Sequence, residues 1–153
     1  MFLAEKRKRR ILDEFNLYQE LKDSLVTTHP PNLDTSFPAQ IPELLGQLNL
    51  FVLNLSSHKQ STVFIACLIG RNLSAIRDMF CNQVIAGNFI DVVQQVLPKK
   101  GYSQSQIYFL IKLFKLVEKF NKLQYVSISV TKFKNNYKFL NKKIEQEADF
   151  WRQ

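Results

Sequence analysis

The chain has 153 residues, of which 46% are hydrophobic and only four are glycine. This length suits one compact domain with a core of its own, and the hydrophobic share excludes a wholly disordered chain. The formal net charge is +8, which indicates a polyanionic partner, either nucleic acid or an anionic membrane surface.

Hydrophobic residues recur at helical spacing along most of the chain and predict an all-α protein, a compact bundle of about six helices. Residues 1–26 carry a basic N-terminal helix, and residues 27–41, which include three prolines, form a linker. A helical domain then spans residues 42–153, with helices expected at 42–55, 61–80, 89–97, 104–122 and 129–151. Polar residues suited to capping stand at the start of four of these helices, namely Ser61, Asn88, Ser103 and Ser129.

Residues 88–122 have the outline of a helix-turn-helix unit, with a short helix, a turn at Gly101 and a longer second helix. At 100° per residue, one narrow arc of the second helix is polar and basic. It holds Gln104, Tyr108, Lys112, Lys115, Lys119 and Lys122. The opposite, wider arc is apolar, so the pattern predicts a helix with one core face and one basic ridge.

Positive charge is concentrated between residues 98 and 143, where eleven lysines accompany one acid, Glu118. A lysine-rich helix face is often simply a solvated face, but ordinary surface helices mix both signs, and the lack of acids favours nucleic-acid contact. Gln104 and Tyr108 stand where a recognition helix contacts bases, and the lysines are suited to phosphates. The predicted nucleic-acid-binding residues are Lys99, Lys100, Ser103, Gln104, Tyr108, Lys112, Lys115, Lys119 and Lys122. DNA is the expected polymer, and RNA remains an alternative.

The expected last helix, residues 129–151, has an apolar stripe at spacings of three and four. Its predicted partner-binding residues are Phe133, Tyr137, Leu140, Ile144 and Trp151. A stripe of this kind fits a protein partner or the core of its own domain equally well, so both interpretations stay open.

Residues that would carry catalysis or bind a metal are scarce. His29 and His58 do not stand at metal-ligand spacing from Cys67 or Cys81, and no glycine-rich phosphate loop or nucleophile motif is present. We therefore expect no enzymatic activity, no cofactor and no metal. The absence of a disulfide framework and of a signal-peptide pattern favours a reducing, intracellular compartment. The apolar runs at 48–55 and 62–70 are too short to span a bilayer, so no membrane partner is expected.

Five consecutive basic residues, 6–10, fit either a nuclear localisation signal or a phosphate-binding arm. The first interpretation predicts a nuclear protein. Together with the basic helix, this run favours a binding protein, and the alternative is a helical scaffold or adaptor that makes no nucleic-acid contact. Peripheral membrane binding ranks last, because Tyr108 is the one large apolar residue on the lysine-bearing arc.

Two segments resemble known DNA-binding families. The sequences Gly87-Asn88-Phe89 and Gly101-Tyr102-Ser103-Gln104-Ser105-Gln106-Ile107-Tyr108 make residues 69–122 similar to the helix-turn-helix class of homeobox-like and plasmid-partition-like domains. The segment Phe133-Lys134-Asn135-Asn136-Tyr137-Lys138 resembles the core of a homeodomain recognition helix. It departs from that pattern at Lys132, where a tryptophan is expected, and in lacking the arginines that follow.

Size, a composition rich in lysine, asparagine and glutamine, and the basic region also resemble the small accessory subunit of a ciliate DNA adenine methyltransferase complex. The catalytic Asp-Pro-Pro-Trp motif of that enzyme family is absent here, as the resemblance implies for a non-catalytic subunit. The same resemblance implies that the first or the last helix docks on methyltransferase subunits while the basic face holds DNA.

Overall fold

The computed structural model describes residues 2–26, 35–57, 62–82, 87–99 and 101–152, and within these ranges the chain is helical without a named strand. The helices are α1 (Phe2–Asp23), α2 (Ile41–Ser57), α3 (Thr62–Cys81), α4 (Phe89–Val96), α5 (Gln104–Lys119), the 3-10 helix η1 (Asn121–Tyr125), α6 (Val130–Asn135), α7 (Tyr137–Gln146) and α8 (Ala148–Trp151). Six helices of the described chain have eight residues or more, so the predicted all-α bundle is confirmed. None of the helices described is long and apolar enough to cross a membrane.

Three of the four predicted helix caps are confirmed, and the fourth, Ser61, lies outside the described residues. The side chain of Asn88 accepts the Ile90 N–H at 2.9 Å, and that of Ser103 accepts the Gln106 N–H at 3.2 Å. Ser129 in the same way accepts the Lys132 N–H at 3.3 Å. Each bond satisfies a donor that the first turn of a helix leaves unpaired, which is why these positions set where α4, α5 and α6 begin.

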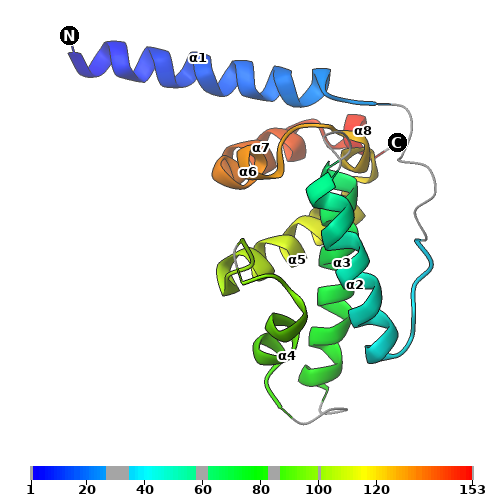
Figure 1. Ribbon diagram of the computed structural model, residues 1–153. Helices are drawn as coiled ribbons and strands as arrows, with labels where there is room; N and C mark the ends of the chain where they lie inside the picture. The colour runs from blue at the N-terminus through cyan, green and yellow to red at the C-terminus, as the bar shows by residue number, and fades with distance from the viewer. Residues whose placement is uncertain (1, 27–34, 58–61, 83–86, 100, 153) are drawn as a thin grey trace.

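Helix α3 is the centre of the bundle and packs against α2 on one side and α5 on the other (Figure 1). The contact with α5 is unusually close, because α3 has a glycine there. A Cβ atom placed on Gly70 would lie 2.0 Å from the carbonyl oxygen of Leu110 and 3.0 Å from the Cβ of Phe114. Only a residue without a side chain allows the two backbones to approach this far.

A buried polar network joins α2, α3 and the chain before α2. Asn72 has no exposed surface, and its amide donates to Gln47 Oε1 at 2.8 Å and to the Leu44 carbonyl at 3.3 Å. Arg71 donates to the carbonyls of Thr35 and Ser36, and Gln47 also donates to Ser36. The described end of the predicted linker, residues 35–40, is therefore held against the bundle, while residues 27–34 lie outside the described residues.

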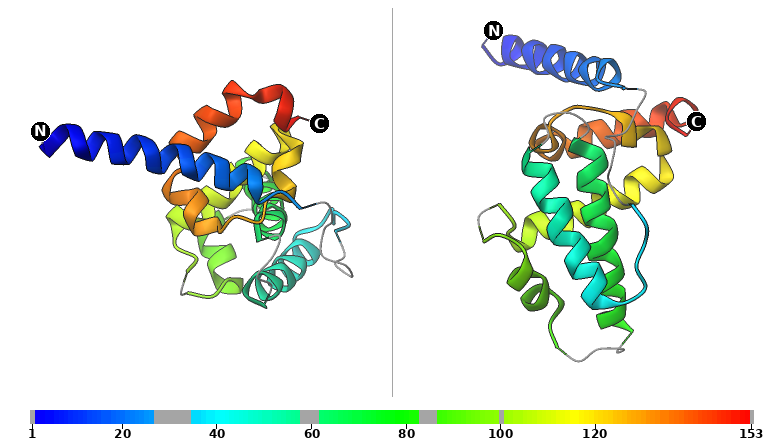
Figure 2. Two further views of the ribbon diagram at one scale, coloured as in Figure 1. Left: turned by 90° about the horizontal axis from the view of Figure 1, so that it is seen from above. Right: turned by 45° about the vertical axis from the view of Figure 1, so that its right-hand side comes forward.

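Helix α1 lies across the helices α6 and α7, and its N-terminal half projects beyond the rest of the molecule (Figures 1 and 2). Its C-terminal half contributes Leu17, Tyr18 and Leu21 to the core. The indole N–H of the fully buried Trp151 donates to the Tyr18 hydroxyl at 3.2 Å, which ties the two ends of the chain together. An antiparallel bridge between Leu25 and Val126 continues this contact.

The prediction of one continuous helix over residues 129–151 is wrong. The chain breaks at Asn136 (φ −122°, ψ 24°) and again at Glu147 (φ −117°, ψ 41°), which gives the three helices α6, α7 and α8. The side chain of Asn136 donates to the Lys132 carbonyl at 2.9 Å, a local bond that competes with the helical pattern. The two bends let the apolar stripe follow the curved surface of the core.

We expect Gly70→Ala to lower the free energy of unfolding by about 3 kcal/mol, because the new methyl group meets backbone that cannot move aside cheaply. Gly46→Ala in α2 is the matched control, since a Cβ there has no atom within 4 Å. That control is expected to raise stability by roughly 0.5–1 kcal/mol through the higher helix propensity of alanine. Chemical denaturation followed by far-ultraviolet circular dichroism measures both, and equal stability of the two variants would contradict the close contact of α3 with α5.

Candidate nucleic-acid interface

The polar arc predicted for α5 is exposed over the length of the helix. Gln104, Tyr108, Lys112, Lys115 and Lys119 all face solvent. The opposite face is buried through Ile107, Phe109, Leu110, Ile111, Leu113, Leu116 and Val117. We call the three exposed lysines Lys112, Lys115 and Lys119 the lysine ridge.

The remaining predicted binding residues are distributed unevenly around this ridge. Lys99 is exposed in the turn before α5, where Gly101 has a φ of +92°, and Ser103 is exposed at the helix cap. Lys100 lies outside the described residues. Lys122 does not continue the ridge, because α5 ends at Lys119 and Lys122 belongs to η1. Its ammonium group lies 3.9 Å from the ring centroid of Phe150, and the side chain is half-buried.

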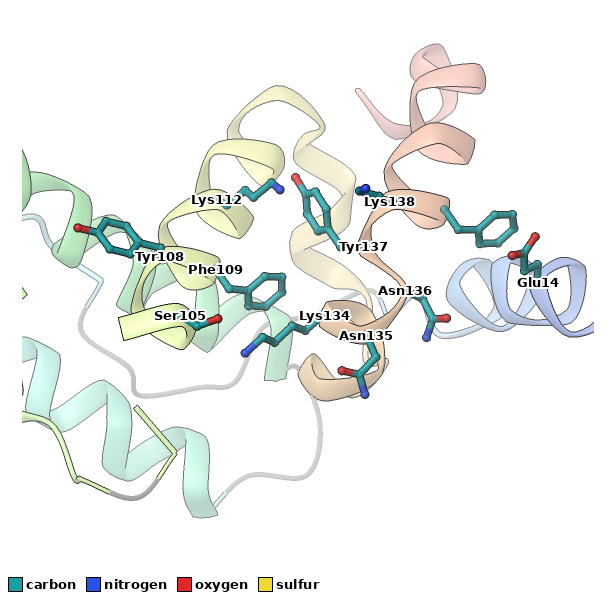
Figure 3. Close-up of a pocket in the computed structure, with 11 residues that line it drawn as sticks. Glu14, Ser105, Tyr108, Phe109, Lys112, Lys134, Asn135, Asn136, Tyr137 and Lys138 are labelled. Atoms are coloured by element: carbon teal, nitrogen blue, oxygen red, sulfur yellow. The ribbon is translucent and has the colours of Figure 1, made fainter. Parts of the chain in front are cut away.

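A groove of about 520 Å³ runs beside the ridge, between α5 and the segment α6–α7 (Figure 3). We call it the α5–α7 groove. Its α5 wall carries Ser105, Tyr108, Phe109 and Lys112. The facing wall carries Lys134, Asn135, Asn136, Tyr137, Lys138 and Phe139, and Glu14 of α1 closes one end.

Contacts across the groove join its two walls. The Lys134 ammonium donates to Gln106 Oε1 at 2.7 Å, so the Gln106 side chain bonds to α6 while its backbone N–H donates to the Ser103 hydroxyl. The Lys112 ammonium lies 4.3 Å from the ring centroid of Tyr137, a cation–π contact. Tyr137 in turn packs edge-on against Phe109 at 6.0 Å.

Burial raises the pKa of the Tyr137 phenol, and the negative charge of Glu145 raises it further. Tyr137 therefore stays neutral at physiological pH and keeps a hydroxyl proton to donate. The groove thus combines positive charge with neutral aromatic and amide groups, which suits a ligand that carries both phosphates and planar rings.

The second wall of this groove was not among the predicted nucleic-acid-binding residues. In the sequence, Lys134 and Lys138 belong to the lysine-rich stretch 98–143, and Tyr137 is predicted to bind a protein partner. The helical period gave no indication that α6 and α7 turn back toward α5. Asn135, singled out by the homeodomain resemblance, is exposed on this wall.

The predicted partner-binding stripe packs inside the protein. Phe133, Leu140, Ile144 and Trp151 have no exposed surface, and Tyr137 is half-buried. The sequence leaves open whether this stripe packs on a partner protein or in the core of its own domain. In the structure it packs in the core of its own domain. The four fully buried side chains offer no surface for a second protein while the chain keeps this fold.

Other residues considered in the sequence are placed as follows. Lys6, Arg7 and Lys8 are exposed on the projecting part of α1. Cys67 is buried, and burial raises its thiol pKa to about 12, while Cys81 is exposed. His29 and His58 lie outside the described residues, and the part of the chain that is described holds no cluster of three or more potential metal ligands.

Comparisons of the chain with protein-family models, with curated proteins and with solved structures give no match.

We expect Trp151→Ala to lower the free energy of unfolding by about 3–5 kcal/mol, because it empties a core position and removes the hydrogen bond from the indole to Tyr18. Leu50→Ala, at a side chain that is 59% exposed, is the control and should stay within about 0.5 kcal/mol of the wild type. Thermal and chemical denaturation of the isolated protein measure both changes. A Trp151→Ala protein as stable as the wild type would mean that the stripe is free for a partner after all.

Proposed function

We propose that this chain is a non-catalytic nucleic-acid-binding accessory protein whose contact surface is the lysine ridge together with the α5–α7 groove. The observation that carries the proposal is the arrangement of exposed lysines on both sides of one groove. Lys112 stands on the α5 wall and Lys138 on the opposite wall, and both are exposed. Lys115 and Lys119 extend the same charge along α5.

Nucleic acid fits this surface better than a small anion does. A phosphate polymer engages several lysines at once and gains from the release of its condensed counterions. Gln104 and Tyr108, at the beginning of α5, supply an amide and an aromatic ring beside the charged residues, and such groups contact bases. A protein that only needed solubility would gain nothing from placing these groups together.

The wider role in the proposal follows the family resemblance. It makes DNA the first polymer to test, with RNA as the alternative, and it places the protein in the nucleus as a subunit of a larger assembly such as a DNA adenine methyltransferase complex. The exposed Lys6, Arg7 and Lys8 support an import signal or an added phosphate contact on α1.

We expect Lys112→Gln, Lys115→Gln and Lys119→Gln in one protein to weaken binding to nucleic acid by roughly ten- to hundredfold at physiological salt. The slope of log K against log salt should fall in magnitude by about two to three, since three phosphate contacts are lost. Fluorescence anisotropy with labelled DNA and RNA across a salt series measures both quantities.

The matched control removes the same three units of net charge elsewhere, through Gln40→Glu, Asn49→Glu and Gln94→Glu. These three side chains are exposed and do not line the α5–α7 groove. The control should bind with nearly the wild-type salt slope. Equal weakening in both proteins would show that only total charge matters and would remove the ridge as the contact surface.

A second candidate function, a helical adaptor, is favoured by one observation. Leu50 and Leu53 lie one turn apart on α2 and are 59% and 58% exposed. Exposed leucines on one helix face are suited to contact with another protein.

For the adaptor, we expect Leu50→Gln with Leu53→Gln to leave the fold intact and to lose subunits that co-purify with the wild type from its source cells. The lysine-ridge variant should keep those subunits. If the double leucine variant retains every subunit while the ridge variant loses nucleic acid, the adaptor candidate is rejected and the binding proposal is retained.

A further inference from the structure

This inference rests on the nucleic-acid binding proposed above. We infer that the α5–α7 groove binds a single strand of nucleic acid. Tyr108 and Tyr137 stack on its bases, and lysines of both walls contact its phosphates. This differs from the duplex-reading role that the helix-turn-helix outline of the sequence implies. Three features of the described residues point to it: the shape around α5, the placement of the aromatic rings and the charge of the lining.

The elements packed beside α5 do not suit insertion of this helix into the major groove of a DNA duplex. A helix with its side chains is about 10–12 Å across, and the major groove of DNA is only about 12 Å wide. A recognition helix therefore fills the groove and needs both of its flanks free near its N-terminal end. Here α6 stands directly beside that end, joined to it by the 2.7 Å bond from Lys134 to Gln106.

A single strand of nucleic acid binds in a groove rather than on a ridge, and the α5–α7 groove has the features that such binding requires. Its volume of about 520 Å³ is bounded by walls from two segments that are far apart in sequence (Figure 3). A flexible strand can lay its backbone along such a groove and turn its bases onto aromatic side chains. Every base has a π face, so this mode predicts weak sequence preference.

The two tyrosines lie at different places: Tyr137 stands between the two walls, and Tyr108 lines the groove from α5 with its ring turned away from Tyr137 (Figure 3). Tyr108 is 41% exposed, and its ring is supported from behind by the buried Phe89 at 6.4 Å. Tyr137 is half-buried and holds its ring beneath the ammonium group of Lys112 at 4.3 Å. Because each ring is already held by its neighbours, it loses little side-chain entropy when a base stacks on it.

The charge of the lining completes the site. Lys112, Lys134 and Lys138 line the groove, and Glu14 of α1 is the one carboxylate among the lining residues. A carboxylate at this place repels a phosphate backbone. Its removal should therefore strengthen binding, an effect that a merely structural role of Glu14 would not produce.

The first test compares a labelled mixed-sequence DNA strand, an RNA strand of the same sequence and the DNA strand annealed to its complement, using fluorescence anisotropy with the full chain. We expect at least one of the single strands to bind more tightly than the duplex. Tyr108→Leu should weaken single-strand binding by about five- to hundredfold through the loss of stacking, whereas Tyr108→Phe, which keeps the ring, should bind like the wild type. Neither change should alter duplex binding.

The second test uses Glu14→Gln, which should tighten single-strand binding about two- to fivefold. Glu43→Gln on α2 makes the same change in net charge at an exposed residue outside the groove and should leave single-strand binding unchanged. Equal tightening in both variants would overturn the assignment of the strand to this groove.

The outcomes separate this inference from the proposed function. Tighter binding to the duplex, with Tyr108→Leu unchanged and the lysine-ridge variant weakened, would overturn the single-strand inference and leave nucleic-acid binding in place. Absence of binding by the wild type to either form at low salt would remove both.

Discussion

The contact of α3 with α5 at Gly70 is the constraint on which the candidate site depends. The missing side chain lets the α3 backbone reach the Leu110 carbonyl, where a Cβ atom would stand only 2.0 Å away. Two helices that touch through backbone cannot rotate about their axes without separating, because the contact has no flexible side chain to adapt. The buried face of α5 is therefore fixed on α3, and Lys112, Lys115 and Lys119 are held on the outside.

The second wall of the groove depends on interactions of a different kind. Two ion pairs join this part of the chain to α1: Lys132 of α6 with Glu20 at 2.8 Å, and Glu147, between α7 and α8, with Lys22 at 2.9 Å. Such exposed pairs contribute little to stability. The full burial of Trp151 and its bond to Tyr18 contribute more, so the core at the meeting of the two chain ends fixes the position of α7.

The local rules of helix formation made much of the fold predictable, and long-range packing limited the rest. Asn88, Ser103 and Ser129 cap helices because their side chains act on the next turn, which is visible in sequence. The apolar stripe from Phe133 to Trp151 indicates which side chains are buried. It does not indicate whether they pack in the core or on a partner protein, because both give the same spacing of apolar residues. The bend at Asn136 follows from local bonding that helical spacing does not record. For this reason the sequence pointed to the α5 wall of the groove and not to the wall that faces it.

The lysines of this chain differ in what their charge already contacts, and that difference separates the candidate site from the rest of the basic surface. Lys119 is 3.5 Å from Glu145, Lys132 pairs with Glu20, and Lys122 rests on Phe150. Among the described residues no carboxylate pairs with Lys112, Lys115 or Lys138. Unpaired like charges held close together raise the free energy of the folded protein, and a polyanion relieves that repulsion when it binds. The net gain on binding is therefore greatest where no carboxylate compensates the lysines, which is at Lys112 and Lys115 on α5 and at Lys138 across the α5–α7 groove.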